Sequence, residues 1–320
     1  MKKRRKKRRP IRARFRLLVF LTVLGLLVYF AGQQIYNRHI DLADLDVNTY
    51  IQGADEASKG RVQVNWQYLA AIDGVRYRND FRQADHESII ALANLFISEN
   101  QDDSNGRQYI LHSLEQVMDK LSLDSRERLT VRLYLQDLEQ VARYRNKIYY
   151  ITRPSASPDF ISRITAGAID NYNDYGIFPS VTIAQAILES GWGASDLSLK
   201  ANNLFGIKAD PSWQGKSIKL NTTEYYNQQT TANFRVYQDI NQSIKDHGKF
   251  IYNNPRYREN KVFSASYYLE QAQALEDAGY STKLDARGNA IYADLLVELI
   301  QQYNLQLLDS RVQEKASGAY

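Results

Sequence analysis

Cysteine is absent from this chain of 320 residues, and histidine occurs only four times. Without cysteine the chain has no disulfide scaffold, no thiolate metal ligand and no cysteine nucleophile. The histidines form no tight cluster, so we expect neither a metal ion nor another cofactor. Hydrophobic residues make up 44% of the chain, which is enough for a packed core and argues against disorder along its whole length.

Acidic residues are absent from the first 16 positions, which hold eleven of the 41 lysine and arginine residues. The rest of the chain therefore has 30 basic against 36 acidic residues, a net charge of −6. A protein that binds nucleic acid usually spreads its positive charge over the folded part. We therefore interpret residues 1–16 as a basic tail and expect no nucleic-acid partner.

An uncharged apolar segment, residues 17–32, follows this tail. Its 16 residues are slightly fewer than the roughly 20 that span a bilayer as a helix, and residues 33–36 can complete the span. Basic residues stay on the cytoplasmic side, which predicts a cytoplasmic N-terminus and an extracellular remainder. We therefore predict one transmembrane anchor over residues 17–36. A cleaved signal peptide is the alternative, for which the chain offers no convincing cleavage site.

The chain after the anchor divides at a segment rich in proline and serine, residues 152–158, which we interpret as a linker. Before it, residues 37–61 are polar and typical of a stalk. Over residues 62–151 apolar side chains recur at three- and four-residue steps, which predicts a helical domain of about four helices. The clearest helical stretches are residues 86–98, 108–121 and 125–150. This domain has no chemical motif and is interpreted as a spacer or as a module that docks a membrane protein.

The second domain, residues 159–309, is predicted to be mostly helical with one β-hairpin. Helices are expected over residues 160–176, 181–190, 243–252, 264–279 and 290–305. Alternating residues rich in threonine and tyrosine predict paired strands over residues 217–226 and 231–237. This order of elements fits a lysozyme-like α+β plan. The polar residues 310–320 are interpreted as a frayed tail.

Glu189 is the most informative residue of the second domain. It lies in the last turn of the predicted helix, directly before Gly191-Trp192-Gly193. The negative end of the helix dipole and the neighbouring Trp192 both disfavour a carboxylate and would raise its pKa. A general acid that protonates a glycosidic oxygen near neutral pH needs such a shift. Most glutamates on helices are solvated surface groups, so this pattern alone is a weak signal.

Short segments around and after Glu189 carry a family resemblance. They are Ser180–Gly193, Ala201–Lys208, Trp213–Lys216, Thr223-Glu224, Asn233–Tyr237, Ser243–His247, Asn254–Tyr257 and Ala278–Tyr280. In this order they closely resemble glycoside hydrolase family 73, the bacterial endo-β-N-acetylglucosaminidases of cell-wall turnover. The resemblance extends over about residues 158–305 and implies a lysozyme-like glycosidase domain.

The resemblance implies that Glu189 is the catalytic acid and that Glu224 is the second acidic residue of the active site. It also matches Tyr280 to an active-site tyrosine, for which a packed core tyrosine with a satisfied hydroxyl is the alternative. A glycosidase that inverts through water holds its carboxyl groups roughly 6.5–9.5 Å apart, and one that forms a covalent intermediate about 5–5.5 Å apart. Two alternatives remain for Glu224. It is an exposed strand residue paired with Lys219, or the acetamide group of the substrate acts as the nucleophile instead.

The residues expected to bind substrate are Trp192, Asn203, Phe205, Trp213 and Tyr237. Packing in the core is the alternative for each aromatic ring, and Asn203 is expected to shape the loop beneath the cleft. His247 is expected to be structural rather than catalytic. The chain departs from the family pattern in two loops, residues 227–229, which lack glycine, and residues 281–290, which lack an Asp-Pro pair. These departures bear on subsite preference and product length.

The resemblance and the anchor together predict a membrane-bound peptidoglycan hydrolase. It would cleave glycan strands between N-acetylglucosamine and N-acetylmuramic acid outside the membrane. A lytic transglycosylase or a muramidase on the same fold is the first alternative. A glycan-binding scaffold that recruits a membrane protein through residues 62–151 is the second.

Overall fold

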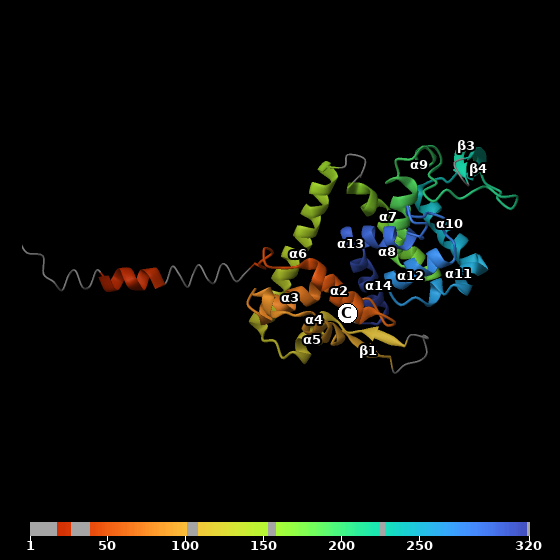
Figure 1. Cartoon of the computed structure of the whole chain (residues 1–320). Coiled ribbons are helices and arrows are strands. Elements are labelled where there is room, and N and C mark those ends of the chain that lie inside the picture. The colour runs from red at the N-terminus through yellow and green to blue at the C-terminus, as the bar shows by residue number, and fades with distance from the viewer. Residues whose placement is uncertain (1–17, 27–38, 101–107, 153–157, 225–227, 319–320) are drawn as a thin grey trace, which may run out of the picture.

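The computed structural model describes residues 18–26, 39–100, 108–152, 158–224 and 228–318. Within these ranges the chain is mostly helical and has two small antiparallel sheets of two strands each. The apolar side chains form two clusters, one in an N-terminal unit of residues 39–152 and one in a C-terminal unit of residues 158–318 (Figure 1). The predicted fold class, mostly helical with a small hairpin, is confirmed at this level.

The N-terminal unit surrounds its cluster with short helices and one small sheet. Its elements are α2 (Val47–Ser58), α3 (Trp66–Arg76), η1 (Phe81–Gln83), α4 (His86–Asn94), β1 (Ile97–Glu99), β2 (Tyr109–Leu111), α5 (Leu114–Lys120) and α6 (Ser125–Thr152). Leu69 and Ile72 are fully buried because residues three apart share one face of a helix. Helix α3 thereby packs against α2 on one side and α6 on another.

Helix α2 lies inside the segment that we predicted to be a stalk, so that prediction is wrong for residues 39–61. Asp46 caps the helix by accepting a hydrogen bond from the backbone N–H of Asn48. Tyr50, Ile51 and Ala54 lie on one face and are buried. The polar residues between them masked this apolar face in the sequence.

The helix predicted over residues 108–121 is also corrected. Residues 109–111 form β2, which pairs with β1 in the register Ile97↔Leu111. Helix α5 begins only at Leu114, because Ser113 and Gln116 form a reciprocal capping box there. A cap defines where a helix begins more sharply than the spacing of apolar residues does.

The C-terminal unit is built around helix α8. Its elements are α7 (Pro158–Tyr175), α8 (Pro179–Ser190), α9 (Asp196–Ala201), β3 (Ser217–Glu224), β4 (Gln228–Arg235), α10 (Ile240–Asn253), α11 (Pro255–Glu259), η3 (Val262–Ser264), α12 (Tyr268–Asp277), α13 (Tyr292–Gln302) and α14 (Gln306–Ala316). Helix α8 contacts α7, α12, α13 and α14, and almost all of its residues are buried. The predicted hairpin is β3–β4, and Figure 1 shows it at the end of this unit farthest from the N-terminal unit.

The C-terminal residues are ordered helix rather than the frayed tail that we predicted. Helix α14 buries Asp309, Ser310 and Gln313, and its Leu307 belongs to the apolar cluster of the N-terminal unit. The Asp309 carboxyl group accepts hydrogen bonds from the backbone N–H and the hydroxyl of Ser180, at the start of α8. Because helix N–H groups at that end lack partners within the helix, Asp309 serves as a cap supplied by another element.

Polar contacts join the two units directly. The buried Asp55 of α2 accepts hydrogen bonds from the Tyr268 hydroxyl and from the Gln301 amide. The backbone N–H of Gln63 donates to Gln313 Oε1 at 2.7 Å, and that of Gly60 donates to a carboxylate oxygen of Glu270 at 2.9 Å. The N-terminal unit therefore packs on the C-terminal unit, although a proline-rich segment connects them.

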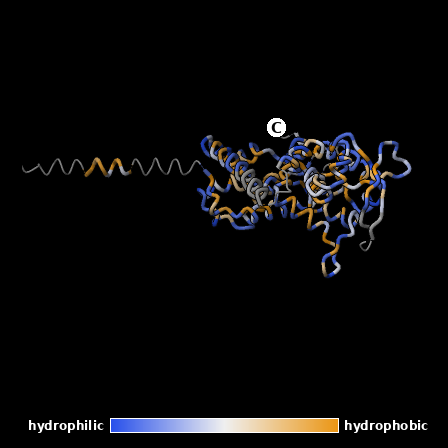
Figure 2. The backbone as a smooth tube through the Cα atoms, turned by 90° about the horizontal axis from the view of Figure 1, so that it is seen from above, coloured by the Kyte–Doolittle hydropathy of each residue, from blue (hydrophilic) through white to orange (hydrophobic). Residues whose placement is uncertain are grey.

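The predicted anchor lies largely outside the described residues. Its residues 18–26 are helical, expose their apolar side chains, and are almost uniformly hydrophobic in Figure 2. Across the ranges that the structure describes, we find no helix with both the length and the apolar character needed to cross a membrane.

Candidate active site

Helix α8 places Glu189 at the edge of an open pocket. The helix ends because Gly191 adopts a left-handed conformation with φ of 56°, a common way to close a helix. Gly193 is also left-handed, and a Cβ atom there would lie 2.8 Å from a ring carbon of Phe160. Glycine is favoured directly after α8 because both positions have a positive φ, and at Gly193 also because a Cβ atom would collide with Phe160.

The pocket has a volume of about 520 Å³ and draws its walls from several elements. Glu189 comes from α8, and Phe205 comes from the loop after α9. His247 comes from α10, Arg256 from α11, and Tyr280 from the loop after α12. Residues up to 91 positions apart in the chain thus converge on one cavity with a carboxyl group at its edge.

The Glu189 carboxyl is held by a short hydrogen-bond chain. The Tyr292 hydroxyl donates to Glu189 Oε1 at 3.0 Å, and the Gln185 amide donates to the Tyr292 hydroxyl at 3.1 Å. Glu189 is exposed toward the pocket and surrounded by protein elsewhere, and this loss of water raises the pKa of its carboxyl. The hydrogen bond from Tyr292 and the charge of Lys283 oppose the shift more weakly. The expected direction of the pKa shift is present, and its largest cause is desolvation.

Tyr280 lies in the same pocket. Its ring stacks on that of Tyr292, with centroids 5.2 Å apart and planes at 22°. Its hydroxyl lies 3.1 Å from Nε2 of His247. The structure thus brings Glu189, Phe205 and Tyr280 to one cavity, as we expected from the sequence.

Trp192 and Asn203, by contrast, do not line this pocket, and their predicted roles in binding substrate stay predictions. The Trp192 ring contacts the edges of Phe160 and Tyr303, with centroids 6.2 and 5.0 Å away. The Asn203 amide donates to the backbone oxygens of Ile207 and Arg235, and its side-chain oxygen accepts from the Ile207 N–H. Trp192 therefore packs against Phe160 and Tyr303 at the end of α8, and Asn203 holds the loop that carries Phe205.

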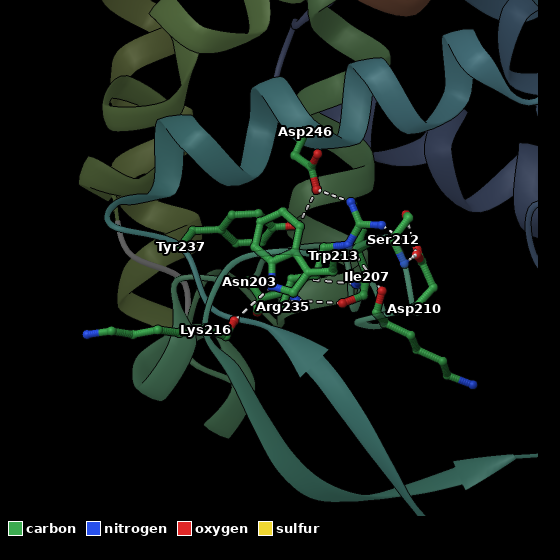
Figure 3. Close-up of polar contacts among 10 residues, drawn as sticks. Asn203, Ile207, Asp210, Ser212, Trp213, Lys216, Arg235, Tyr237 and Asp246 are labelled. Atoms are coloured by element: carbon green, nitrogen blue, oxygen red, sulfur yellow. Dashed lines mark hydrogen bonds and ion pairs between the residues drawn. The ribbon is translucent and has the colours of Figure 1, made fainter.

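Tyr237 is likewise part of a polar network, which Figure 3 shows beneath α10. Its hydroxyl donates to Asp246 at 2.7 Å. Arg235 reaches the same Asp246 oxygen at 2.8 Å and Asp210 at 2.6 Å. With only 3% of its surface exposed, Tyr237 is held inside this network, and its role in binding substrate stays a prediction.

Trp213 lies at the border of a neighbouring pocket of about 490 Å³. Its indole N–H donates to the backbone oxygen of Lys216 at 2.9 Å, and the Arg235 guanidinium lies 4.8 Å from its ring centroid (Figure 3). Arg235 and Phe250 line both pockets, so the two cavities are adjacent. Trp213 is half-buried, and its accessible part faces this extension of the site.

Glu224 is the last residue of β3, opposite Gln228 of β4. The position of its side chain lies outside the described part of the structure, so its role stays a prediction.

The sequence analysis missed Tyr292 as a partner of Glu189. Tyr292 lies 103 positions away, and the Tyr-Ala-Asp segment that contains it carried no sign of this contact. In the described residues no group of three or more histidine, aspartate or glutamate side chains is arranged to hold a metal ion.

The family described as mannosyl-glycoprotein endo-beta-N-acetylglucosaminidase matches residues 165–305. The chain is 36% identical over 156 residues to the exo-glucosaminidase LytG of Bacillus subtilis, covering 47% of this chain and 52% of that protein. It is 33% identical over 184 residues to the peptidoglycan hydrolase FlgJ of Escherichia coli, covering 52% and 56% respectively. The chain thus spans about half the length of these curated relatives.

Among solved structures, the catalytic domain of the autolysin Auto from Listeria monocytogenes is 33% identical in sequence. The match covers 52% of this chain and 97% of that domain, with a TM-score of 0.42.

Proposed function

We propose that the chain hydrolyses the glycan strands of peptidoglycan with Glu189 as the general acid, because residues 165–305 belong to the glucosaminidase family, glycoside hydrolase family 73. The observation that carries the assignment of Glu189 is its carboxyl group at the pocket edge with a pKa raised by desolvation. A raised pKa keeps a fraction of the carboxyl groups protonated at the pH where the enzyme works.

The hydrogen bond from Tyr292 supports a definite geometry for the acid. Because Tyr292 donates to Oε1, that oxygen is an acceptor and the acidic proton resides on Oε2. Oε2 then delivers the proton to the glycosidic oxygen as the bond to the anomeric carbon breaks. Tyr292 and Gln185 hold the carboxyl in place during this transfer.

Two routes complete the reaction, and they predict different products. If Glu224 activates water on the opposite face of the sugar, the anomeric configuration inverts. If the acetamide of the substrate attacks first, the configuration is retained, and Tyr280 is placed to orient that group. NMR of the first anomer released separates the two routes.

The cleaved bond is proposed to join N-acetylglucosamine to N-acetylmuramic acid. The name of the Bacillus relative, an exo-glucosaminidase, supports this linkage. Mass spectrometry of digested peptidoglycan tests it, because this cleavage leaves N-acetylglucosamine at the reducing end. Anhydro-muramic ends would instead indicate a transglycosylase, and reducing muramic acid a muramidase.

The site of action is proposed to be the outer face of the cell membrane. The basic residues 1–16 and the apolar residues 17–36 support a single anchor with the N-terminus inside. The folded units would then act on strands close to the membrane. Membrane fractionation with external protease tests this placement, and recovery of the full chain in the soluble fraction would contradict it.

The Glu189→Gln substitution tests the central assignment. Gln keeps the size of the side chain and can accept from Tyr292, but it has no acidic proton to give. We expect release of reducing ends to fall by about 100-fold or more, the usual contribution of a general acid, with an unchanged melting temperature. The exposed Glu259→Gln is the matched control. Full activity of the Glu189 variant would overturn the proposal.

A further inference from the structure

His247 of α10 is completely buried beside the pocket. Its ring lies flat on Phe205, with centroids 3.7 Å apart and planes at 9°, while its edge faces Tyr280. Burial lowers the pKa of His247 to about 3, so the ring is neutral at physiological pH. A neutral imidazole carries one N–H and one bare nitrogen.

The contacts of the two ring nitrogens decide which one carries the hydrogen. Nε2 lies 3.1 Å from the Tyr280 hydroxyl, and Nδ1 is buried with no hydrogen-bond partner among the described groups. A buried N–H without an acceptor is rarer and costs more than an unused lone pair. The hydrogen therefore belongs on Nε2, which donates to the Tyr280 oxygen.

This tautomer fixes the orientation of the Tyr280 hydroxyl. Since the oxygen accepts from His247, its own hydrogen must point away from the histidine ring. Tyr280 stacks on Tyr292, which donates to Glu189, and both Tyr280 and Glu189 line the same pocket. The Tyr292 hydroxyl, which lies beside that of Tyr280, already donates to Glu189 and accepts from Gln185. The Tyr280 hydrogen is then available to an acceptor in the cavity.

We propose that His247 is a positioning residue that holds the Tyr280 hydroxyl as a hydrogen-bond donor to a substrate oxygen in the pocket. The oxygen that fits this chemistry is the carbonyl of an N-acetyl group. The inference rests on the proposed function, and it gives a specific task to a residue that we expected to be structural rather than catalytic. His247 itself contacts no substrate.

A matched pair of variants tests the proposal. Gln places an amide N–H near the position of Nε2, whereas Asn reaches only the position of Nδ1. The full chain acts on solubilised uncrosslinked peptidoglycan strands, and kcat and KM are measured from the reducing ends released. We expect His247→Asn to lower kcat about tenfold, the effect of one lost hydrogen bond, and His247→Gln to retain most of it. Equal losses in the two variants would overturn the proposal.

Coupling to Tyr280 supplies the second measurement. In a Tyr280→Phe background the hydroxyl is gone, so His247→Asn should cause no further loss of kcat. A further tenfold loss there would show that His247 acts through packing and would refute the positioning role. Melting temperatures of all variants are measured alongside. If His247 acts through packing, the loss of kcat should correlate with the loss of melting temperature, whether or not Tyr280 keeps its hydroxyl.

The experiments distinguish a failure of the proposed function from a failure of this inference. If Glu189→Gln stays fully active, the assignment of the acid fails. If Glu189→Gln is inactive while His247→Asn has the kcat of the wild type, only the role of His247 fails.

Discussion

Glu189 illustrates how a few neighbours set the chemistry of one residue. Desolvation raises its pKa, while the hydrogen bond from Tyr292 lowers it by a smaller amount. The same tyrosine therefore orients the acid and limits the pKa shift. Because a general acid acts in its protonated form, the activity falls as the pH rises through the pKa of Glu189.

Tyr292→Phe should move this limb of the pH–activity profile. The substitution removes the hydrogen bond that favours the carboxylate, so the pKa of Glu189 rises and the alkaline limb shifts to higher pH. It also leaves the Gln185 amide without its acceptor, at a cost of about 1–3 kcal/mol in stability. A pH–rate profile checks the shift, with the exposed Tyr252→Phe as control. A shift to lower pH would contradict the assignment of the acid.

At the scale of the element, the exit from α8 determines where Glu189 can lie. Gly191 and Gly193 both have positive φ and differ in their surroundings. A Cβ atom at Gly191 would meet no atom within 4 Å, whereas one at Gly193 would collide with Phe160. The two positions thus separate the cost of the backbone angle from that of a clash.

Alanine substitutions at these two glycines should differ in size. Gly191→Ala is expected to lower the free energy of unfolding by about 1–2 kcal/mol, the cost of a left-handed angle for a residue with Cβ. Gly193→Ala is expected to cost more, because Phe160 must also move. Urea unfolding of both variants measures the difference. Equal costs would mean that the helix exit relaxes freely around Phe160.

At the scale of the whole molecule, α14 contacts both the N-terminal unit and the start of α8. Its Asp309 caps the start of the helix whose end carries Glu189, and its Gln313 accepts from Gln63 of the N-terminal unit. The residues matched by the family end at 305, just before this helix. One of the elements that join the two units therefore lies outside the family match, while Tyr268 and Gln301, which contact Asp55, lie inside it.

The buried carboxyl of Asp309 gives the fold a pH-dependent stability. Burial raises its pKa to about 8, against 3.8 as the ordinary value. Between these values the folded state keeps a proton that the unfolded state releases, so stability falls as the pH rises from about 4 to about 8. In Asp309→Asn the amide oxygen can accept from the Ser180 N–H and the amide NH2 can donate to the Ser180 hydroxyl oxygen. The side chain no longer ionises, so the substitution should flatten this decline. Melting curves across the range test it, with the exposed Asp277→Asn as control.

Removing the N-terminal unit should destabilise the catalytic unit. A chain that begins at residue 158 loses Asp55 as the partner of Tyr268 and Gln63 as the donor to Gln313. It also exposes Leu307, which is 8% accessible in the whole chain. We expect a lower melting temperature and lower solubility than for residues 39–318. An unchanged melting temperature would show that the units fold independently.

The local patterns of the sequence were sufficient for the class of fold, the hairpin and the position of Glu189 at a helix end. These features depend on neighbours within a few residues, such as the apolar spacing in α8 and the glycines that follow it. The sequence failed where polar residues hid an apolar face, as in α2, and where a cap moved a helix start, as at Ser113.

Only the tertiary structure decided what surrounds Glu189 and which predicted site residues reach it. Tyr292 donates to Glu189 across 103 positions, and Tyr280 meets His247 across 33. The contacts of Trp192 with Tyr303 and of Tyr237 with Asp246 also join residues that are not neighbours in the sequence. Contacts of this kind depend on how whole helices pack. The spacing of apolar and polar residues within one segment does not reveal which distant segments pack against it.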